Sequence, residues 1–332
     1  MQCTQDDKPL LIAQGDEYTA ISNGSRKKML TFKINHNLYM ECFEFLGRIL
    51  QNNRWSDNKM KQMLKIELER AFRSSGFWLS LMIGMLISII QYIQKVIPAV
   101  SEILLPMKDK LAIPVCVHQT WIAMGDGWYY TLFVRLIPLL AVIPYAVTYY
   151  TDNKKGIVHN YYSRTNKINY LLAKWMAVFI TGGMTAIIPL MVNLMATSAV
   201  LPSFIALDYI ISCNANGMWS YILYSHPYIY YILSFILQFI CAGLIATVSL
   251  LISQYVNNAF IVLLFPSVLC EFMNATAGWL PTRKLKALAP WRLFRIDQLA
   301  VKYWQTYVIF ICTILVMDLV VYVWRGVKDD VL

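Results

Sequence analysis

The chain has 332 residues, of which 58% are hydrophobic and only 14% are charged, and its formal net charge is +10. Because an average soluble domain carries about 25% charged residues, this composition argues against a soluble enzyme and against a soluble nucleic-acid-binding protein. The apolar residues are gathered in long uncharged runs. We therefore predict an all-α membrane protein with no nucleic-acid partner.

The first 58 residues are mixed and mostly polar, and residues 1–30 contain no apolar signal-peptide core. We predict a cytosolic N-terminal extension over residues 1–58, with a short helix near Leu38–Leu50. The segment Asp57–Arg73 is predicted to form an amphipathic helix that lies on the cytosolic membrane surface, or else a cytosolic extension of the first span. Its apolar positions recur every three or four residues: Met60, Leu64, Leu68 and Ala71.

Residues 59–332 are predicted to form one domain of six membrane-spanning helices, since a helical span needs about 20 mostly apolar residues. The run Tyr209–Cys270 has no charge and is too long for one helix, and the polar patch 253–258 divides it into two. The predicted spans are 76–93, 129–150, 175–195, 227–251, 259–277 and 306–324.

The distribution of positive charge predicts the orientation of these spans. Six spans place both termini on one side, which then holds 19 of the 29 Lys and Arg residues, against nine on the other side. The positive-inside rule therefore predicts that both termini are cytosolic. Six of the nine outer cations lie in 278–302, where they alternate with Trp, Leu and Phe. We interpret this segment as an outer amphipathic element, although a misplaced span is the alternative.

Three charged residues fall inside the predicted spans, where ionisable groups are costly and are candidate functional residues. Arg135 and Glu271 each lie about 9 Å from the outer end of their span, so we predict an ion pair. This pair would either gate the outer end of a pathway or fix helix packing. Asp318 lies toward the inner third of the sixth span, where it would reach the surface, cap against Arg325 or relay protons.

The sequence lacks the motifs of several kinds of catalytic and metal-binding site. The chain has seven cysteines but no CxxC pair, and its four histidines are scattered. It contains no phosphate-binding loop, no H-E-x-x-H and no G-x-S-x-G motif. We therefore expect no catalytic residue, no metal site and no cofactor on this chain. Cys116 and Cys213 fall in two loops predicted on the outer side and are a candidate disulfide.

The loop between the second and third spans is short and basic and leads directly into an apolar helix. It resembles the same region in permeases of ABC type 2 exporters, where an acidic residue and a Gly-Thr pair precede a Ser-Arg pair and a lysine. The corresponding residues here are Asp152, Lys155-Gly156-Ile157, Ser163-Arg164 and Lys174. The segment Leu64–Gly84 is similar to the family's basic interfacial helix entering the first span. Asp152 and Ile157 depart from the usual Glu and Thr, and the N-terminal extension is not typical of the family.

The resemblance implies a permease dimer, with a second copy or a homologue, that works with two separate ATPase subunits. ATP and Mg²⁺ would then bind to the partner subunits. The loop between the second and third spans would carry the coupling helix, with Tyr162, Ser163, Arg164 and Lys167 as ATPase contacts. The expected substrate is amphipathic, such as a peptide or an antimicrobial. We expect a multi-pass protein of the cell membrane, specifically a bacterial plasma membrane, in contact with membrane lipid.

Two other classes of function agree less well with the sequence than a permease does. A channel or receptor without an ATPase would show a polar stripe along one span, whereas the polar positions here are isolated. An enzyme embedded in the membrane would need convergent nucleophiles or metal ligands, which the spans lack. The basic loop at 151–175 favours the permease.

Overall fold

The computed structural model describes residues 10–14, 17–21, 57–104, 115–124, 127–162, 166–203, 218–281, 286, 288–295, 304–323 and 325–326. The chain divides into two compact units, Met1–Trp55 and Ser56–Leu332. In the first unit, strands β1 (Leu10–Gln14) and β2 (Glu17–Ile21) pair antiparallel. The helix predicted near Leu38–Leu50 lies outside the described residues.

This hairpin is a local exception to the all-α prediction. Its sequence signal is present: the two strands are rich in β-branched and aromatic residues, and Gly15-Asp16 lies between them. A glycine followed by Asp is a typical two-residue connection between antiparallel strands. The prediction of a mixed, mostly polar N-terminal extension did not include this hairpin.

Among its described residues, the second unit contains six helices that are long and apolar enough to cross a membrane. Each overlaps one predicted span, so the prediction of a multi-pass helical membrane protein is confirmed at this level. The third helix begins at Lys167, eight residues before the predicted span, and it contains Lys174 as a buried residue. The six are Ser75–Ser101, Trp128–Lys154, Lys167–Val200, Pro227–Ser253, Ala259–Ala277 and Trp304–Val323.

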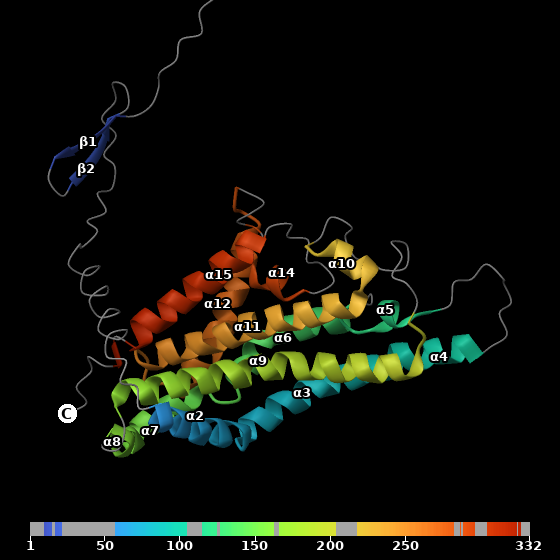
Figure 1. Ribbon diagram of the computed structural model, residues 1–332, viewed down its shortest axis with the longest axis horizontal. Helices are drawn as coiled ribbons and strands as arrows, with labels where there is room; N and C mark the ends of the chain where they lie inside the picture. The colour runs from blue at the N-terminus through green and yellow to red at the C-terminus, as the bar shows by residue number, and fades with distance from the viewer. Residues whose placement is uncertain are drawn as a thin grey trace, which may run out of the picture. The chain divides into compact units, whose positions relative to one another are not determined.

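The helices of this unit are shown in Figure 1. In the first half of the chain they are α2 (Asp57–Phe72), α3 (Ser75–Gln91), the π-helix η1 (Tyr92–Val96), α4 (Ile97–Leu104), α5 (Val117–Thr120), α6 (Trp128–Val142), α7 (Val147–Lys154), α8 (Ile157–Tyr162) and α9 (Lys167–Val200). In the second half they are α10 (Ser220–Ser225), α11 (Pro227–Ser253), α12 (Ala259–Ala277), α14 (Pro290–Phe294), α15 (Trp304–Met317) and the π-helix η2 (Asp318–Val323).

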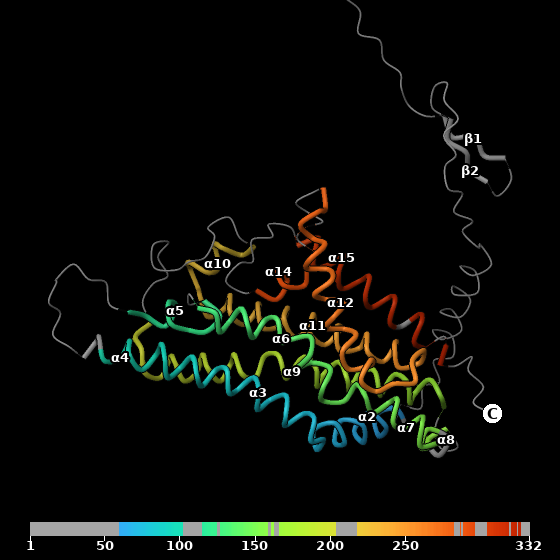
Figure 2. Tube along the Cα trace, turned by 180° about the vertical axis from the view of Figure 1, so that it is seen from behind, coloured from blue at the N-terminus to red at the C-terminus, as the bar shows by residue number. Residues whose placement is uncertain are grey.

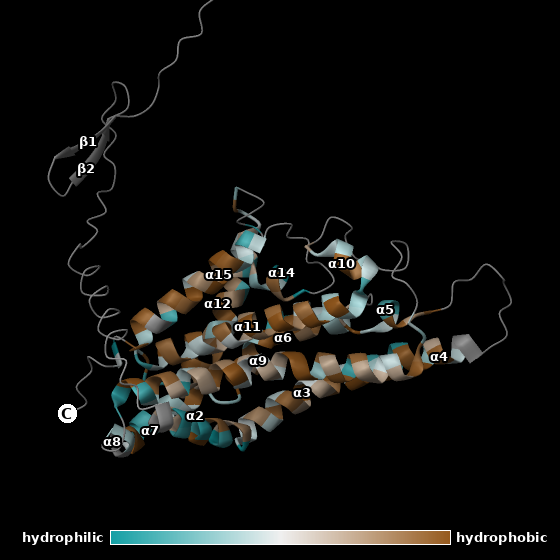
Figure 3. Cartoon of the chain, in the orientation of Figure 1, coloured by the Kyte–Doolittle hydropathy of each residue, from teal (hydrophilic) through white to brown (hydrophobic). Residues whose placement is uncertain are grey.

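Helix α9 lies at the centre of the bundle and contacts α2, α3, α6 and α11 (Figures 1 and 2). Apolar residues line the long helices, whereas hydrophilic residues gather where α2, α7 and α8 lie side by side (Figure 3). A hydrophilic end of this kind is where a membrane protein leaves the bilayer. We call it the α2–α8 end.

Small residues allow α9 and α11 to approach closely. A Cβ atom at Gly182 would lie 2.6 Å from the Cβ of Ala246, and one at Gly243 would lie 2.6 Å from the carbonyl oxygen of Phe179. Both distances are shorter than any stable contact. Such glycines are common where membrane helices pack, because lipid supplies little drive for association and close backbone contact must supply it.

We expect Gly243→Ala to destabilise the bundle by about 1–3 kcal/mol, because the added methyl group meets backbone and forces the helices apart. The matched control is Gly278→Ala at the end of α12, where an added Cβ has no neighbour within 4 Å. Thermal unfolding of both variants in one detergent measures the difference. Equal midpoints would contradict the close α9–α11 packing.

Candidate functional site

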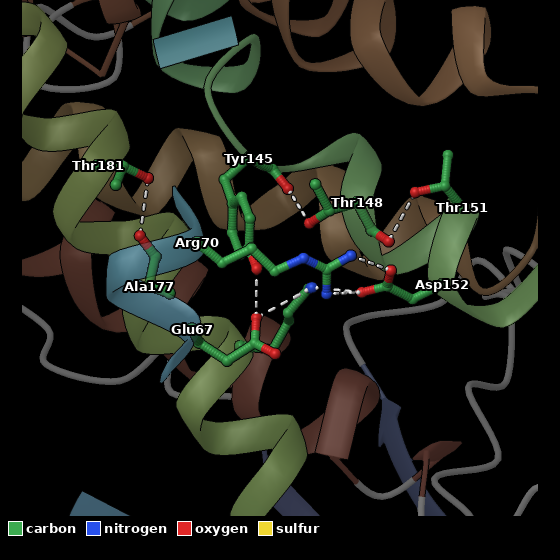
Figure 4. A network of polar contacts seen from close by, with 9 residues as sticks. Glu67, Arg70, Tyr145, Thr148, Thr151, Asp152, Ala177 and Thr181 are labelled. Carbon is green, nitrogen blue, oxygen red and sulfur yellow. Dashed lines mark hydrogen bonds and ion pairs between the residues drawn. The ribbon is translucent and has the colours of Figure 1, made fainter. Parts of the chain in front are cut away.

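A buried network of charges lies at the α2–α8 end and joins three helices (Figure 4). Helix α2 contributes Glu67 and Arg70, α7 contributes Asp152, and α9 contributes Lys174. Tyr145, in the turn between α6 and α7, completes it. We call these five residues the charge network.

Lys174 is the centre of the network, and its side chain is fully buried. Its Nζ atom lies 2.8 Å from Oδ2 of Asp152 and 3.1 Å from Oε2 of Glu67. The same ammonium lies 4.4 Å from the centroid of the Tyr145 ring, within cation–π range. Two carboxylates and an aromatic face thus surround the buried ammonium in place of water.

Arg70 binds Asp152 through both arms of its guanidinium. Nη1 donates to Oδ2 at 2.8 Å, and Nη2 donates to Oδ1 at 2.5 Å. This bidentate geometry is the strongest form of arginine–carboxylate contact. The hydrogen bonds to Asp152 hold the pKa of the Arg70 guanidinium above its ordinary value. Asp152 is thus shared between a buried lysine and a half-exposed arginine.

Glu67 is the second carboxylate of the network and is fully buried. Its Oε2 atom accepts hydrogen bonds from the Tyr145 hydroxyl at 2.5 Å and from Lys174. With Asp152 and the two cations, the network carries two negative and two positive formal charges. Buried charges are tolerated when they are paired and hydrogen-bonded in this way, and the pairing binds α2 to both α7 and α9.

The short segment between α7 and α9 is held in place by this arrangement. Gly156 ends α7 with a φ of 68°, a left-handed conformation that glycine adopts without strain. The Tyr161 ring of α8 then stacks on Tyr170 of α9 at 5.2 Å, and the Tyr162 ring meets Tyr170 edge-on at 5.8 Å. The Nζ atom of Lys167 lies 5.5 Å from the centroid of the Tyr162 ring. Helix α8 is therefore tied to the beginning of α9.

The residues expected to contact an ATPase are only partly described. Tyr162 and Lys167 lie together beside Tyr170, where each contributes to the attachment of α8. Ser163 and Arg164 lie outside the described residues. The structure contains a single chain, so it does not test whether these residues contact an ATPase. That role stays a prediction.

The expected ion pair between Arg135 and Glu271 is not formed. Both side chains are exposed on neighbouring helices, α6 and α12. The Arg135 guanidinium instead faces the Trp291 ring, 5.0 Å from its centroid. Equal depth in the membrane had suggested the pair, but α14, which contacts both helices, places an aromatic ring beside the arginine.

Asp318 is the third charged residue predicted inside a span. It is buried at the start of η2, where one of its carboxylate oxygens accepts a hydrogen bond from the Thr247 hydroxyl. It neither reaches the surface nor caps against Arg325, whose guanidinium lies 3.8 Å from the centroid of the Tyr255 ring. A proton-relay role for Asp318 stays a prediction.

The remaining sequence predictions concern cysteines and metals. Cys116 is a buried free thiol before α5, and Cys213 lies outside the described residues. The candidate disulfide is therefore not formed at Cys116. Within the part of the chain that the structure describes, no group of three or more His, Cys, Asp or Glu side chains could hold a metal ion.

Sequence reasoning singled out Asp152 and Lys174 through the family resemblance but missed Glu67, Arg70 and Tyr145 as partners. The predicted apolar face of α2 comprises Met60, Leu64, Leu68 and Ala71, widened by Met63 and Ile66. Of these, Met63 and Ala71 are buried, together with Glu67, which the prediction did not include. A signal was available. Glu67 and Arg70 share a face with Met63 at three- and four-residue spacing. A carboxylate buried on that face needs a cation from elsewhere in the fold as its partner.

A scan of the chain against protein-family models finds no match, and a search of curated proteins finds none either. The charge network must therefore be interpreted from its own chemistry.

We expect Lys174→Met to destabilise the protein by about 3–5 kcal/mol, because it leaves two buried carboxylates without their shared cation. The matched control is Lys65→Met on the same end, since Lys65 lies 3.9 Å from Glu69 in an exposed pair. That pair should contribute less than about 0.5 kcal/mol. Thermal unfolding in detergent compares the two, and a Lys174→Met protein as stable as Lys65→Met would refute the stabilising role of the network.

Proposed function

We propose that the chain is the permease subunit of an ATP-driven ABC type 2 exporter, which a separate ATPase subunit drives to export an amphipathic substrate such as a peptide or an antimicrobial. The observation that carries the proposal is the charge network. The two segments that resemble the family, Leu64–Gly84 and the loop after the second span, meet in it through Glu67, Arg70, Asp152 and Lys174.

The network gives the loop the mechanical property that a coupling element needs. A soluble motor can move membrane helices only if the loop it pushes does not yield. Here α7 and α9 are joined through Asp152 and Lys174, and α8 is stacked on α9 through Tyr161 and Tyr170. A displacement of α8 would therefore pass to α9, the helix that contacts most of the bundle.

We also propose the orientation of the chain in the membrane and its binding partners. The α2–α8 end and both termini are cytosolic, in keeping with the positive-inside rule, and α2 lies at the membrane surface. The ATPase, with its ATP and Mg²⁺, binds at α8 and the residues that follow it. A second permease, identical or homologous, completes the transporter in a bacterial plasma membrane.

Affinity purification of the chain in mild detergent, followed by mass spectrometry, tests the proposal. We expect a soluble ATP-binding subunit in a stoichiometric ratio to the permease. Its reproducible absence, under conditions that preserve other membrane complexes, would favour a channel or receptor.

We further expect Arg164→Glu to reduce recovery of the ATPase at least tenfold, because it reverses a charge at the coupling loop while leaving the chain in the membrane. Lys95→Glu is the control, since Lys95 is exposed on η1, which leads into α4, and α4 lies away from the α2–α8 end (Figure 1). Undiminished recovery and transport with Arg164→Glu would remove the loop from the coupling role.

A further inference from the structure

Helix α14 is a short element inserted among four spans at the end of the bundle where α6 begins. Its last residue, Phe294, accepts hydrogen bonds through its carbonyl oxygen from the Tyr130 hydroxyl of α6 at 3.0 Å and from Nε2 of Gln238 of α11 at 3.1 Å. The Trp291 backbone N–H donates to Oδ1 of Asn274 of α12 at 3.0 Å. Tyr307 of α15 donates to the Leu293 carbonyl oxygen at 3.4 Å. Hydrogen bonds to four spans therefore hold α14 in place.

This anchoring places the Trp291 ring within cation–π distance of two arginines. The Arg135 guanidinium lies 5.0 Å from the centroid of the Trp291 ring, and the Arg295 guanidinium lies 5.7 Å from it. Arg295 also lies 5.9 Å from the Tyr130 ring centroid. Two cations on one ring repel each other, so an anion near them would lower the electrostatic energy of the group. We call Arg135, Trp291 and Arg295 the arginine–tryptophan site.

Arg135 most needs such an anion. It is exposed inside a spanning helix, it cannot lose its charge, and no carboxylate of the described chain lies within ion-pair distance of it. A guanidinium exposed to hydrocarbon costs at least about 2.5–3.5 kcal/mol. Arg295 has a further contact of its own, so the inference rests on Arg135.

The depth of Arg135 indicates which anion is available. It lies seven residues after Trp128, about 10 Å along the helix. Trp128, Trp279 and Trp304 are all highly exposed at this end of the bundle, as expected for the aromatic belt at headgroup level. Arg135 therefore lies just below the headgroups, within reach of a lipid phosphate, and a guanidinium fork matches two phosphate oxygens.

We propose that the arginine–tryptophan site binds the phosphate of an anionic lipid headgroup against the α6–α14 surface. The phosphate binds the Arg135 guanidinium, which lies against the Trp291 ring. The site requires only that the chain spans a membrane, so it stands apart from the proposed transport function.

The test measures binding of phosphatidylglycerol to the full-length protein in detergent by native mass spectrometry, with phosphatidylcholine as the neutral lipid. We expect phosphatidylglycerol to bind at least tenfold more tightly than phosphatidylcholine, and the double variant Arg135→Gln, Arg295→Gln to lose this preference. Arg135→Lys, which keeps the charge but not the fork, should lose only part of it and serves if the double variant is unstable.

Two controls separate the alternatives. Arg73→Gln removes an exposed arginine near the α2–α8 end and should leave the lipid preference unchanged. Glu271→Gln should also leave it unchanged, and a gain in phosphatidylglycerol preference would show that Glu271 holds Arg135 in an ion pair instead. Retained binding in the double variant would overturn the site. Displacement of the lipid by millimolar inorganic phosphate would show that free phosphate is the ligand and would overturn the lipid assignment.

Discussion

The placement of the α2–α8 end depends on the ammonium group of Lys174. Burying a charged group is costly unless it is paired, and here Asp152 and Glu67 pair with the Lys174 ammonium at 2.8 and 3.1 Å. Because these acids belong to α7 and α2, the distant helix α2 must converge with α7 and α9 on one point. Any arrangement that separates them leaves a charge buried without its partner, so the network selects one relative position of the three.

The charge network also fixes the positions of the neighbouring helices. Helix α2 ends two residues after Arg70. The chain then bends at Ser74, whose hydroxyl caps α3 and also donates to the Pro144 carbonyl oxygen at 2.8 Å. The same turn between α6 and α7 carries Tyr145, which binds Glu67. The first span therefore begins against the end of α6, while α9 continues from the network to the close crossing with α11 at Gly182 and Gly243. Rigid packing at one end and close backbone contact in the middle make α9 the helix through which the bundle is organised.

The spans could be predicted from the sequence because burial in lipid depends on local composition, and runs of 19–34 residues carry that signal strongly. The pairing of charges could not. Lys174 and Glu67 are separated by 107 positions, and the pattern of a helix reveals which face is polar but not what that face meets. Arg135 shows the same limit. Its depth followed from counting residues, but its neighbour depended on α14, whose insertion among four spans no local pattern encodes. Ser163, Arg164 and Cys213 lie outside the described residues, so their predicted roles stay predictions.

The charge balance of the network has a consequence for energetics across a polarised membrane. A transmembrane voltage acts on a displaced charge with about 2.3 kcal/mol per elementary charge per 100 mV. The two carboxylates and two cations sum to zero and are held within a few ångströms of one another, so a rigid displacement of the group moves no net charge through the field. A transmembrane voltage would therefore neither drive nor oppose a rigid displacement of the charge network itself.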